Sequence, residues 1–410
     1  MEMLGADRVT LSACALAVRE FTFPALCCLG RHIAVNTVHR LRECASLVAR
    51  GSPFRHVRSL DLGITTTTTI RERDWDDYLG ILRFFARTRS LTRLWLSGVS
   101  FCFPKPSGQR AIADVIVPLA ATVNELGLYS CRFSCYAEVI SLIRAFPLCT
   151  SLFVRDCVGR KTPGANVLTK LPQHTLRLTE LELTSSSRHK YLIDVSTLIE
   201  DAALDISSLT GFSCDMSTAD AARHALMAAD ASPIERLQLA CDEAQGFRGE
   251  SKSSKNARVS FVQVLADPVV TAWPLKSLTI GPIVQKNVPW CGRATDLTLS
   301  LPYLETVTIL CYYRRPVENL LRCWRKIDRL LSRRDLFPHL ERLDICITVA
   351  STRLQHAECK AIAQSLPKLH KAGKVYFWGE KSECTPPPGR SVLPIDNPPS
   401  CFPIRRLLVV

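Results

Sequence analysis

In this sequence of 410 residues, four residues separate Gly159 from Gly164, as in a phosphate-binding loop. These two glycines are therefore a candidate site for nucleotide binding and catalysis. Such a loop needs Lys and then Ser or Thr after its second glycine, because these side chains contact the phosphates and the metal ion. Ala165 stands there instead. The sequence also has no G-x-G-x-x-G, no nucleophile elbow, no H-E-x-x-H pair and no kinase motif set. We therefore predict that the protein is not an enzyme and needs no cofactor.

Cysteine and histidine side chains are a second source of chemistry, because thiolates and imidazoles bind zinc. Cys131 and Cys135 lie close together in the sequence, and His174 follows far along the chain. His356 and Cys359 form a similar isolated pair. A structural zinc ion requires four converging ligands, and neither pair has a second pair to match it. No metal site is predicted.

A helical period over residues 316–334 separates basic from apolar side chains. The basic side chains on one face are Arg322, Arg325, Lys326, Arg329 and Arg333. The apolar stripe consists of Val317, Leu320, Leu321, Trp324, Ile327 and Leu331. Two interpretations follow. The basic face binds an acidic partner or a phosphate group, or it is the solvated outer face of a helix in a basic protein.

The whole chain is basic, with 52 Lys and Arg against 38 Asp and Glu and a formal net charge of +14. A positive charge of this size suits nucleic acid. However, no nucleic-acid-binding motif is present, and no aromatic residues alternate with the cations to stack on bases. Nucleic acid is therefore not the expected partner. Neither is a membrane, because the sequence has no run of 18 uncharged apolar residues.

The 18 cysteines mostly replace aliphatic residues within apolar runs, as at Cys14, Cys149, Cys214 and Cys311. This placement indicates reduced, buried thiols that pack as small hydrophobic side chains. The sequence also has no Asn-x-Ser/Thr acceptor for glycosylation. We expect the protein to be cytoplasmic or nuclear.

An apolar-x-x-apolar-x-apolar pattern recurs ten times, first at Val57, Leu60 and Leu62. The middle apolar residues of the ten units are Leu60, Leu94, Leu126, Leu152, Leu181, Phe212, Leu237, Leu278, Val307 and Leu343. Because side chains alternate along a strand, the last two apolar residues of each unit lie on one face and their polar neighbours lie on the other. Helical periods separate the strands at residues 75–87, 109–120, 136–146, 194–207, 218–229, 259–266, 316–334 and 355–366.

Strands that alternate with helices predict an α/β fold with parallel strands, arranged either as a doubly wound sheet or as an open solenoid. The strands of a doubly wound sheet are buried on both faces, whereas these keep one polar face. The pattern therefore favours an irregular leucine-rich-repeat-like solenoid of about ten strand–helix units. The spacing averages about 31 residues, longer than in regular repeats, and the Asn or Cys position that follows each strand in those repeats is not kept.

Three segments are predicted along the chain. Residues 1–45 form a short helical segment, residues 46–383 form the solenoid, and residues 384–410 form a Pro-rich tail. A polar stretch rich in Ser and Lys at 243–258 interrupts the solenoid and is predicted to be a surface loop.

The N-terminal residues 9–35 resemble the C-terminal half of an F-box, as it occurs in fungal F-box/leucine-rich-repeat-like proteins. The resemblance is carried by Thr10, Leu11, Cys14, Leu16, Val18, Arg19, Phe21, Leu29, Arg31 and Ile33. In that family the box binds the Skp-type adaptor of a cullin–RING ubiquitin ligase, and the repeats capture a substrate. The residues that the resemblance implies for adaptor binding are Leu11, Cys14, Leu16, Val18, Phe21 and Leu29.

The box departs from the family pattern at its start, because the Leu-Pro-x-Glu helix that normally opens it would precede Met1. The resemblance therefore implies a truncated or divergent box. The residues also allow a plain helical cap that shields the first strand of a solenoid, and the two interpretations are compatible.

From these features we expect a non-catalytic protein-interaction adaptor, with the F-box-like segment binding the Skp-type adaptor and the repeats binding a protein target. The polar residues that face the target would be those flanking Leu60, Leu94, Leu126, Leu181, Leu237 and Leu343. The alternatives are a leucine-rich-repeat scaffold with no ligase connection and a basic nucleic-acid-binding protein.

Overall fold

A computed structural model describes much of the chain in separate stretches. These are residues 31–49, 57–63, 72–101, 106–159, 171–184, 198–199, 204–215, 226, 229–240, 267–284, 301–313, 321–349 and 352–379. The chain divides into two compact units, Met1–Ser208 and Leu209–Val410, here called unit 1 and unit 2.

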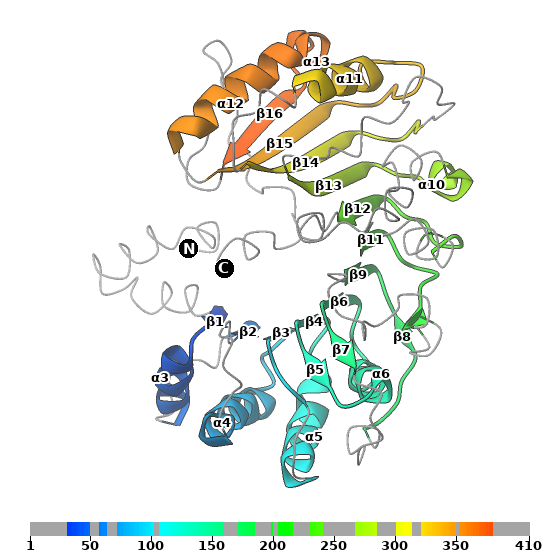
Figure 1. The fold of residues 1–410 in the computed structure, drawn as a ribbon. Helices are drawn as coiled ribbons and strands as arrows, with labels where there is room; N and C mark the ends of the chain where they lie inside the picture. The colour runs from blue at the N-terminus through cyan, green and yellow to red at the C-terminus, as the bar shows by residue number, and fades with distance from the viewer. Residues whose placement is uncertain are drawn as a thin grey trace, which may run out of the picture. The chain divides into compact units, whose positions relative to one another are not determined.

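Unit 1 contains a parallel sheet whose strands follow one another in chain order (Figure 1). Its strands are β1 (His32–Val35), β2 (Ser59–Gly63), β3 (Arg93–Ser97), β4 (Glu125–Tyr129), β6 (Ser151–Arg155) and β9 (Glu180–Thr184). Two short parallel pairs accompany the sheet: β5 (Arg132–Phe133) with β7 (Val158–Gly159), and β8 (Leu176–Arg177) with β10 (Leu204–Asp205).

The helices of unit 1 that the structure describes lie on one face of its sheet (Figure 1). They are α3 (Val38–Ala49), α4 (Glu72–Thr88), α5 (Pro106–Ala120) and α6 (Tyr136–Arg144). In α4, the side chains at Tyr78, Ile81, Leu82 and Phe85 have helical spacing and are fully buried. They pack on the sheet face that carries the repeated apolar residues such as Leu60, which is also fully buried. The opposite face of the sheet, here called the open face, carries the polar neighbours.

Unit 2 repeats this architecture, with parallel strands again in chain order. Its strands are β11 (Gly211–Asp215), β12 (Arg236–Ala240), β13 (Ser277–Val284), β14 (Thr306–Tyr313), β15 (Arg342–Val349) and β16 (Val375–Gly379). The register between β13 and β14 shifts between Ile280 and Ile283. Gly281 lies at this irregularity with a φ of +134°, a conformation that only glycine adopts without strain.

The described helices of unit 2 are α10 (Pro268–Ala272), α11 (Leu321–Leu331), α12 (Thr352–Ser365) and α13 (Pro367–Lys371). The last three lie together on one face of β14, β15 and β16 (Figure 1). Trp324, Ile327 and Leu331 of the predicted apolar stripe are buried, and Leu321 is half-buried. Val317 and Leu320 lie outside the described residues.

A recurrent turn follows three strands of unit 1. Gly98, Ser130 and Asp156 come directly after β3, β4 and β6, and their φ angles are 69°, 51° and 52°. The residue after each turn is buried, and two of these residues are Cys131 and Cys157. The Sγ of Cys131 lies 3.2 Å from the carbonyl oxygen of Leu96, and that of Cys157 lies 3.4 Å from the carbonyl oxygen of Leu128. Each thiol therefore bonds to the preceding strand.

The predicted α/β class and the parallel strands are confirmed. The last two apolar residues of each of the ten patterns lie in a strand of unit 1 or unit 2, because the middle residues from Leu60 to Leu343 are all strand residues. The helical periods at 75–87, 109–120, 136–146 and 355–366 correspond to α4, α5, α6 and α12. The periods at 218–229 and 259–266, the loop at 243–258 and the tail at 384–410 lie wholly or mostly outside the described residues.

Two helix predictions are wrong in part. Residues 204 and 205 form β10, not the end of a helix over 194–207. The Asp205 carboxylate accepts hydrogen bonds from the backbone N–H and the hydroxyl of Ser207, and such a turn competes with helix formation. The helix predicted over 316–334 is described as α11, which ends at Leu331, three residues before the predicted end; residues 316–320 lie outside the described part of the chain.

The sheet of unit 1 begins earlier than the segment boundary predicted at residue 45. β1 pairs in parallel with β2 from His32 to Val35, and α3 follows it. The strand–helix alternation therefore already includes residues 32–49, which the sequence had assigned mainly to a helical cap.

Most of the described cysteines fit the prediction of buried thiols, whereas Cys135 and Cys346 are half-buried. Cys149, Cys214 and Cys311 are buried and reduced, whereas Cys14 lies outside the described residues. Burial raises the pKa of Cys149 to about 12 and that of Cys44 to about 11. Such thiols stay protonated and unreactive near neutral pH.

Candidate binding surface on the open strand face

The open face of unit 1 carries rows of side chains set by the parallel register. The central row runs across five strands through Asp61, Trp95, Gly127, Phe153 and Glu182. Neighbouring strands lie about 4.8 Å apart, so residues in a row are close enough to contact one another. The row therefore combines two aromatic rings at its centre with a carboxylate at each end.

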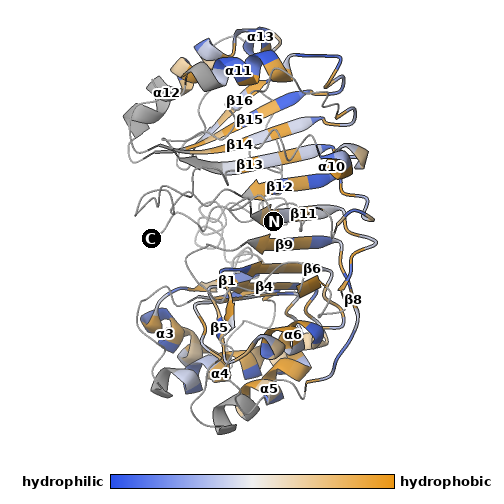
Figure 2. Cartoon of the chain, turned by 45° about the vertical axis from the view of Figure 1, so that its right-hand side comes forward, coloured by the Kyte–Doolittle hydropathy of each residue, from blue (hydrophilic) through white to orange (hydrophobic). Residues whose placement is uncertain are grey.

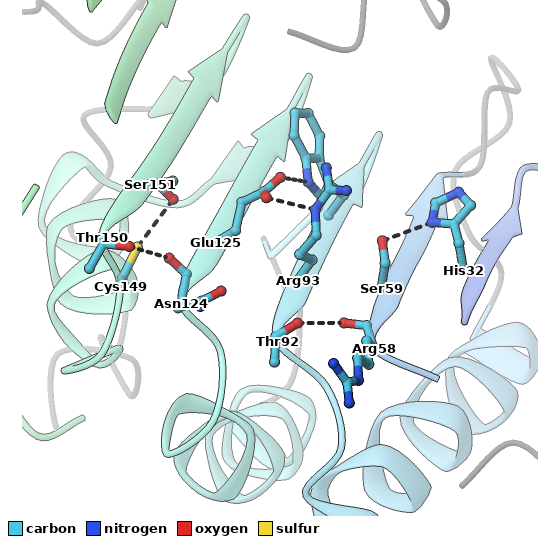
Figure 3. Close-up of polar contacts among 11 residues, drawn as sticks. His32, Arg58, Ser59, Thr92, Arg93, Asn124, Glu125, Cys149, Thr150 and Ser151 are labelled. Carbon is cyan, nitrogen blue, oxygen red and sulfur yellow. Dashed lines mark hydrogen bonds and ion pairs between the residues drawn. The ribbon is translucent and has the colours of Figure 1, made fainter. Parts of the chain in front are cut away.

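Arg93, Trp95 and Glu125 form a compact group on this face, here called the β3–β4 cluster. The indole Nε1 of Trp95 donates a hydrogen bond of 2.8 Å to Oε1 of Glu125. The Nε of Arg93 lies 2.6 Å from Oε2 of the same carboxylate. Figure 3 shows Arg93 and Glu125 pointing toward each other from neighbouring strands. Both carboxylate oxygens are thus engaged, and the indole is held in one orientation.

Gly127 makes room for the indole of Trp95. A Cβ atom at Gly127 would overlap the indole ring, so no larger residue fits under this side chain without moving it. On the far side of Gly127 the indole stacks on Phe153, with ring centroids 5.1 Å apart and an interplanar angle of 29°. Offset stacking of this kind adds about 0.5–1.5 kcal/mol beyond area burial. Three neighbouring strands therefore fix the position of Trp95.

A second aromatic–cation pair lies on the same face. The guanidinium carbon of Arg155 lies 5.6 Å from the centroid of the Tyr129 ring, within the range of a cation–π contact. At the N-terminal end of the sheet, Nδ1 of His32 lies 2.8 Å from the hydroxyl of Ser59 (Figure 3). The open face of unit 1 is therefore rich in Trp, Tyr and Arg, the residue types that dominate binding energy in protein interfaces.

Unit 2 has a related group at Arg342, Asp344 and Trp378, here called the β15–β16 cluster. Oδ1 of Asp344 accepts a hydrogen bond of 2.7 Å from the indole Nε1 of Trp378 and one of 2.8 Å from Nε of Arg342. The guanidinium of Arg342 also lies over the rings of Tyr376 and Trp378, 4.9 and 5.4 Å from their centroids. Asp344 is only 1% exposed, so this carboxylate is a buried part of the fold.

The prediction that the polar residues flanking the apolar positions are exposed is wrong for several of them. Asp344, Glu182 and Gln238 are all buried, and Arg93 and Trp95 are half-buried. Closely spaced parallel strands bring these side chains against one another, so they cover each other while still lying on the open face. The predicted face is therefore present, but its central residues are packed.

The predicted basic face divides between a helix and a turn. Arg325, Lys326 and Arg329 are exposed on α11. Arg333 lies beyond the helix and pairs with Asp335, its Nη2 2.6 Å from Oδ2. Arg322 lies in α11, but its side chain is outside the described part of the chain. Three of the five predicted cations are therefore exposed together on α11, and a fourth forms an ion pair in the turn that follows.

Sequence reasoning missed the partners that complete each cluster. Gly127 could have been recognised, because a glycine inside a strand often marks a close approach of another group. Tyr376 and Trp378 belong to a short aromatic run whose strand preference is strong. Val375 and Phe377 continue the recurrent spacing after Ala372 and pair with Leu343 and Ile345, so β16 is a further unit that the ten predicted strands do not include.

Among the residues that the structure describes, no three His, Cys, Asp or Glu side chains converge to hold a metal ion. In that same part of the chain, no helix is both long enough and apolar enough to cross a membrane. The predicted adaptor-binding residues, Leu11, Cys14, Leu16, Val18, Phe21 and Leu29, lie outside the described residues. No model of a protein family matches this sequence, and no curated protein matches it.

Proposed function

We propose that this chain is a non-catalytic protein-interaction adaptor built from leucine-rich-repeat-like units, whose open strand face binds a protein target. In this proposal the F-box-like segment connects the repeats to the Skp-type adaptor of a cullin–RING ubiquitin ligase. The observation that carries target binding is the β3–β4 cluster, in which Trp95 is held over Gly127 by Glu125 and Phe153. A rigid Trp contributes binding energy at a low entropic cost, because it loses little freedom when a partner binds.

The repeat interpretation is supported by the turn that follows β3, β4 and β6. Regular leucine-rich repeats have the pattern L-x-x-L-x-L-x-x-N/C-x-L. Val123, Leu126, Leu128 and Cys131 follow it, and Cys131 bonds to the backbone of the preceding unit. Cys157 does the same one unit later. The ladder position, which the sequence as a whole does not keep, is therefore retained in two adjacent units.

Target binding through the open face is tested with the Trp95→Ala variant in the full chain. Partners are captured by proximity labelling with the intact protein and then purified. The expected result is a loss of about 2 kcal/mol or more in affinity for a purified partner, the size of an interface hot spot. Trp378→Ala removes the corresponding indole of unit 2 and serves as the matched control. Unchanged affinity in Trp95→Ala would remove the open face of unit 1 from the proposal.

The ligase connection needs a separate experiment. A chain that lacks residues 1–30 keeps β1 and α3, whereas removal of residues 1–45 would delete β1 and damage the sheet. Pull-down of the Skp-type adaptor is expected with the full chain and not with the shortened one. A point variant, Phe21→Asp, tests the same segment without truncation. If neither the full chain nor the variant captures the adaptor, the protein is a repeat scaffold with no ligase connection.

A further inference from the structure

A basic surface extends over α11 and α13 in unit 2. α11 exposes Arg325, Lys326 and Arg329, and α13 exposes Lys368 and Lys371. Figure 2 shows hydrophilic segments on both helices. The sequence assigned a basic face to one helix alone, whereas the structure continues it onto a second helix about 40 residues away in the chain.

Asp328 joins the two helices. Its side chain is only 3% exposed, and its Oδ1 accepts hydrogen bonds from the backbone N–H groups of Lys368, at 3.1 Å, and Leu369, at 2.9 Å. These are N–H groups of the first turn of α13, which have no partner within their own helix. Asp328 lies three residues after Arg325 and one before Arg329. The carboxylate therefore holds the first turn of α13, which carries Lys368, against α11.

The carboxylates described on α11 and in the turn after it are already engaged. Asp328 is buried between the helices. Asp335 is engaged by Arg333, in the turn after α11. The only aromatic side chain of α11, Trp324, is buried, so this helix presents no ring on which a nucleic-acid base could stack.

We propose that the α11–α13 surface is a second docking site that binds an acidic segment of a partner protein. Arg325 and Arg329 lie one helical turn apart and can each form a two-pronged contact with a carboxylate. Lys368 and Lys371 add point charges beside them. This site is independent of the open strand face, because its residues belong to helices and to a different unit from the β3–β4 cluster.

The test uses the full-length protein and a fluorescein-labelled 20-residue peptide of alternating Glu and Gly, with binding followed by fluorescence anisotropy. We expect the R325E/R329E variant to bind this peptide at least about tenfold more weakly than the original chain. The R83E/R87E variant is the matched control, because Arg83 and Arg87 are also exposed and four residues apart, on α4 of unit 1. It carries the same change in net charge and should bind within about twofold of the original.

The Asp328→Ala variant tests whether the two helices act together. Loss of this carboxylate makes the protein more positive, so a purely long-range attraction would strengthen peptide binding. We expect this variant to bind the peptide more weakly, because the Asp328 carboxylate fixes the first turn of α13 and hence Lys368. Circular dichroism verifies that each variant is folded.

Three results would overturn the proposal. One is equal weakening in both arginine double variants, which would indicate attraction by net charge alone. A second is tighter binding of a DNA duplex than of the peptide, if R325E/R329E also weakens the binding of DNA. A third is the same result for vesicles that contain phosphatidylserine.

Discussion

Units 1 and 2 each bring an indole, a guanidinium and a carboxylate together on strands, but they take these groups from different positions. In the β3–β4 cluster, Arg93 and Trp95 share one strand and Glu125 comes from the next. In the β15–β16 cluster, Arg342 and Asp344 share a strand and Trp378 comes from the next. Residues two apart on a strand and residues on paired strands are both neighbours on one face. The same chemistry therefore arises from two arrangements of the chain.

The length of the acidic side chain separates the two clusters. The Asp344 side chain is 1% exposed, and one of its oxygens receives both Arg342 and Trp378. The Glu125 side chain is 19% exposed and uses one oxygen for each partner. Arg93 is also twice as exposed as Arg342, at 44% against 22%. The shorter carboxylate lies deeper, so the unit 2 cluster is enclosed while the unit 1 cluster is more exposed to solvent.

The largest expected difference comes from removing each carboxylate. Asp344→Ala leaves Arg342 and the indole of Trp378 without their shared acceptor in a buried site, and we expect a loss of about 3–5 kcal/mol in the free energy of unfolding. Glu125→Ala acts on a more exposed pair and should cost about 1 kcal/mol. Urea unfolding followed by circular dichroism measures both. Equal losses would show that the two clusters do not differ in burial as their structures indicate.

A smaller effect is expected at the glycine beneath the unit 1 indole. Gly127→Ala forces Trp95 away from Phe153 and Glu125, at an expected cost of about 1–3 kcal/mol. The matched control is Gly80→Ala in α4, where an added Cβ meets no atom within 4 Å. This control should stabilise the protein by about 0.5–1 kcal/mol, because alanine favours a helix over glycine. Thermal unfolding of the two variants compares them, and a neutral Gly127→Ala would mean that the indole position is not fixed.

The smallest effect concerns the two arginines. Arg342→Lys keeps the charge but loses the planar contact with the rings of Tyr376 and Trp378, so we expect a loss of about 1 kcal/mol. Arg93→Lys should cost less than about 0.5 kcal/mol, because Arg93 is 44% exposed and a lysine there can still reach the Glu125 carboxylate. Both values come from urea midpoints. If Arg93→Lys lowered the free energy of unfolding more than Arg342→Lys does, the β3–β4 cluster would be the one that contributes more to stability.

Much of the fold could be predicted because the apolar positions repeat. Leu60 and Leu62 define a strand with one buried face, and the same pattern identifies nine further strands. Periodicity reports how a segment meets the core. It failed at residues 204–205, where a local Asp205–Ser207 turn replaced the helix. It also missed β16, whose Val375 and Phe377 follow only the small apolar residue Ala372.

The candidate sites could be predicted only by residue type. The sequence indicates that Arg93, Glu125 and Asp344 lie on the polar strand face, and that Arg325 and Arg329 share a helix face. The residues that contact them lie on other strands or helices, and no local sequence pattern specifies how those elements align. Asp328 was one acidic residue within a basic helix, and its role depends on the first turn of α13, which begins 39 residues later.

The sequence by itself determined the α/β class, the positions of the ten patterned strands, the buried thiols and the basic character of α11, because each depends on the order of apolar and polar residues within a short segment. Only the tertiary structure decided which polar residues are packed, which are exposed and which lie together. Burial and contact depend on the register of neighbouring strands and on the packing of distant helices. These decide that Asp344 is enclosed, that Trp95 rests on Gly127, and that Asp328 joins α11 to α13.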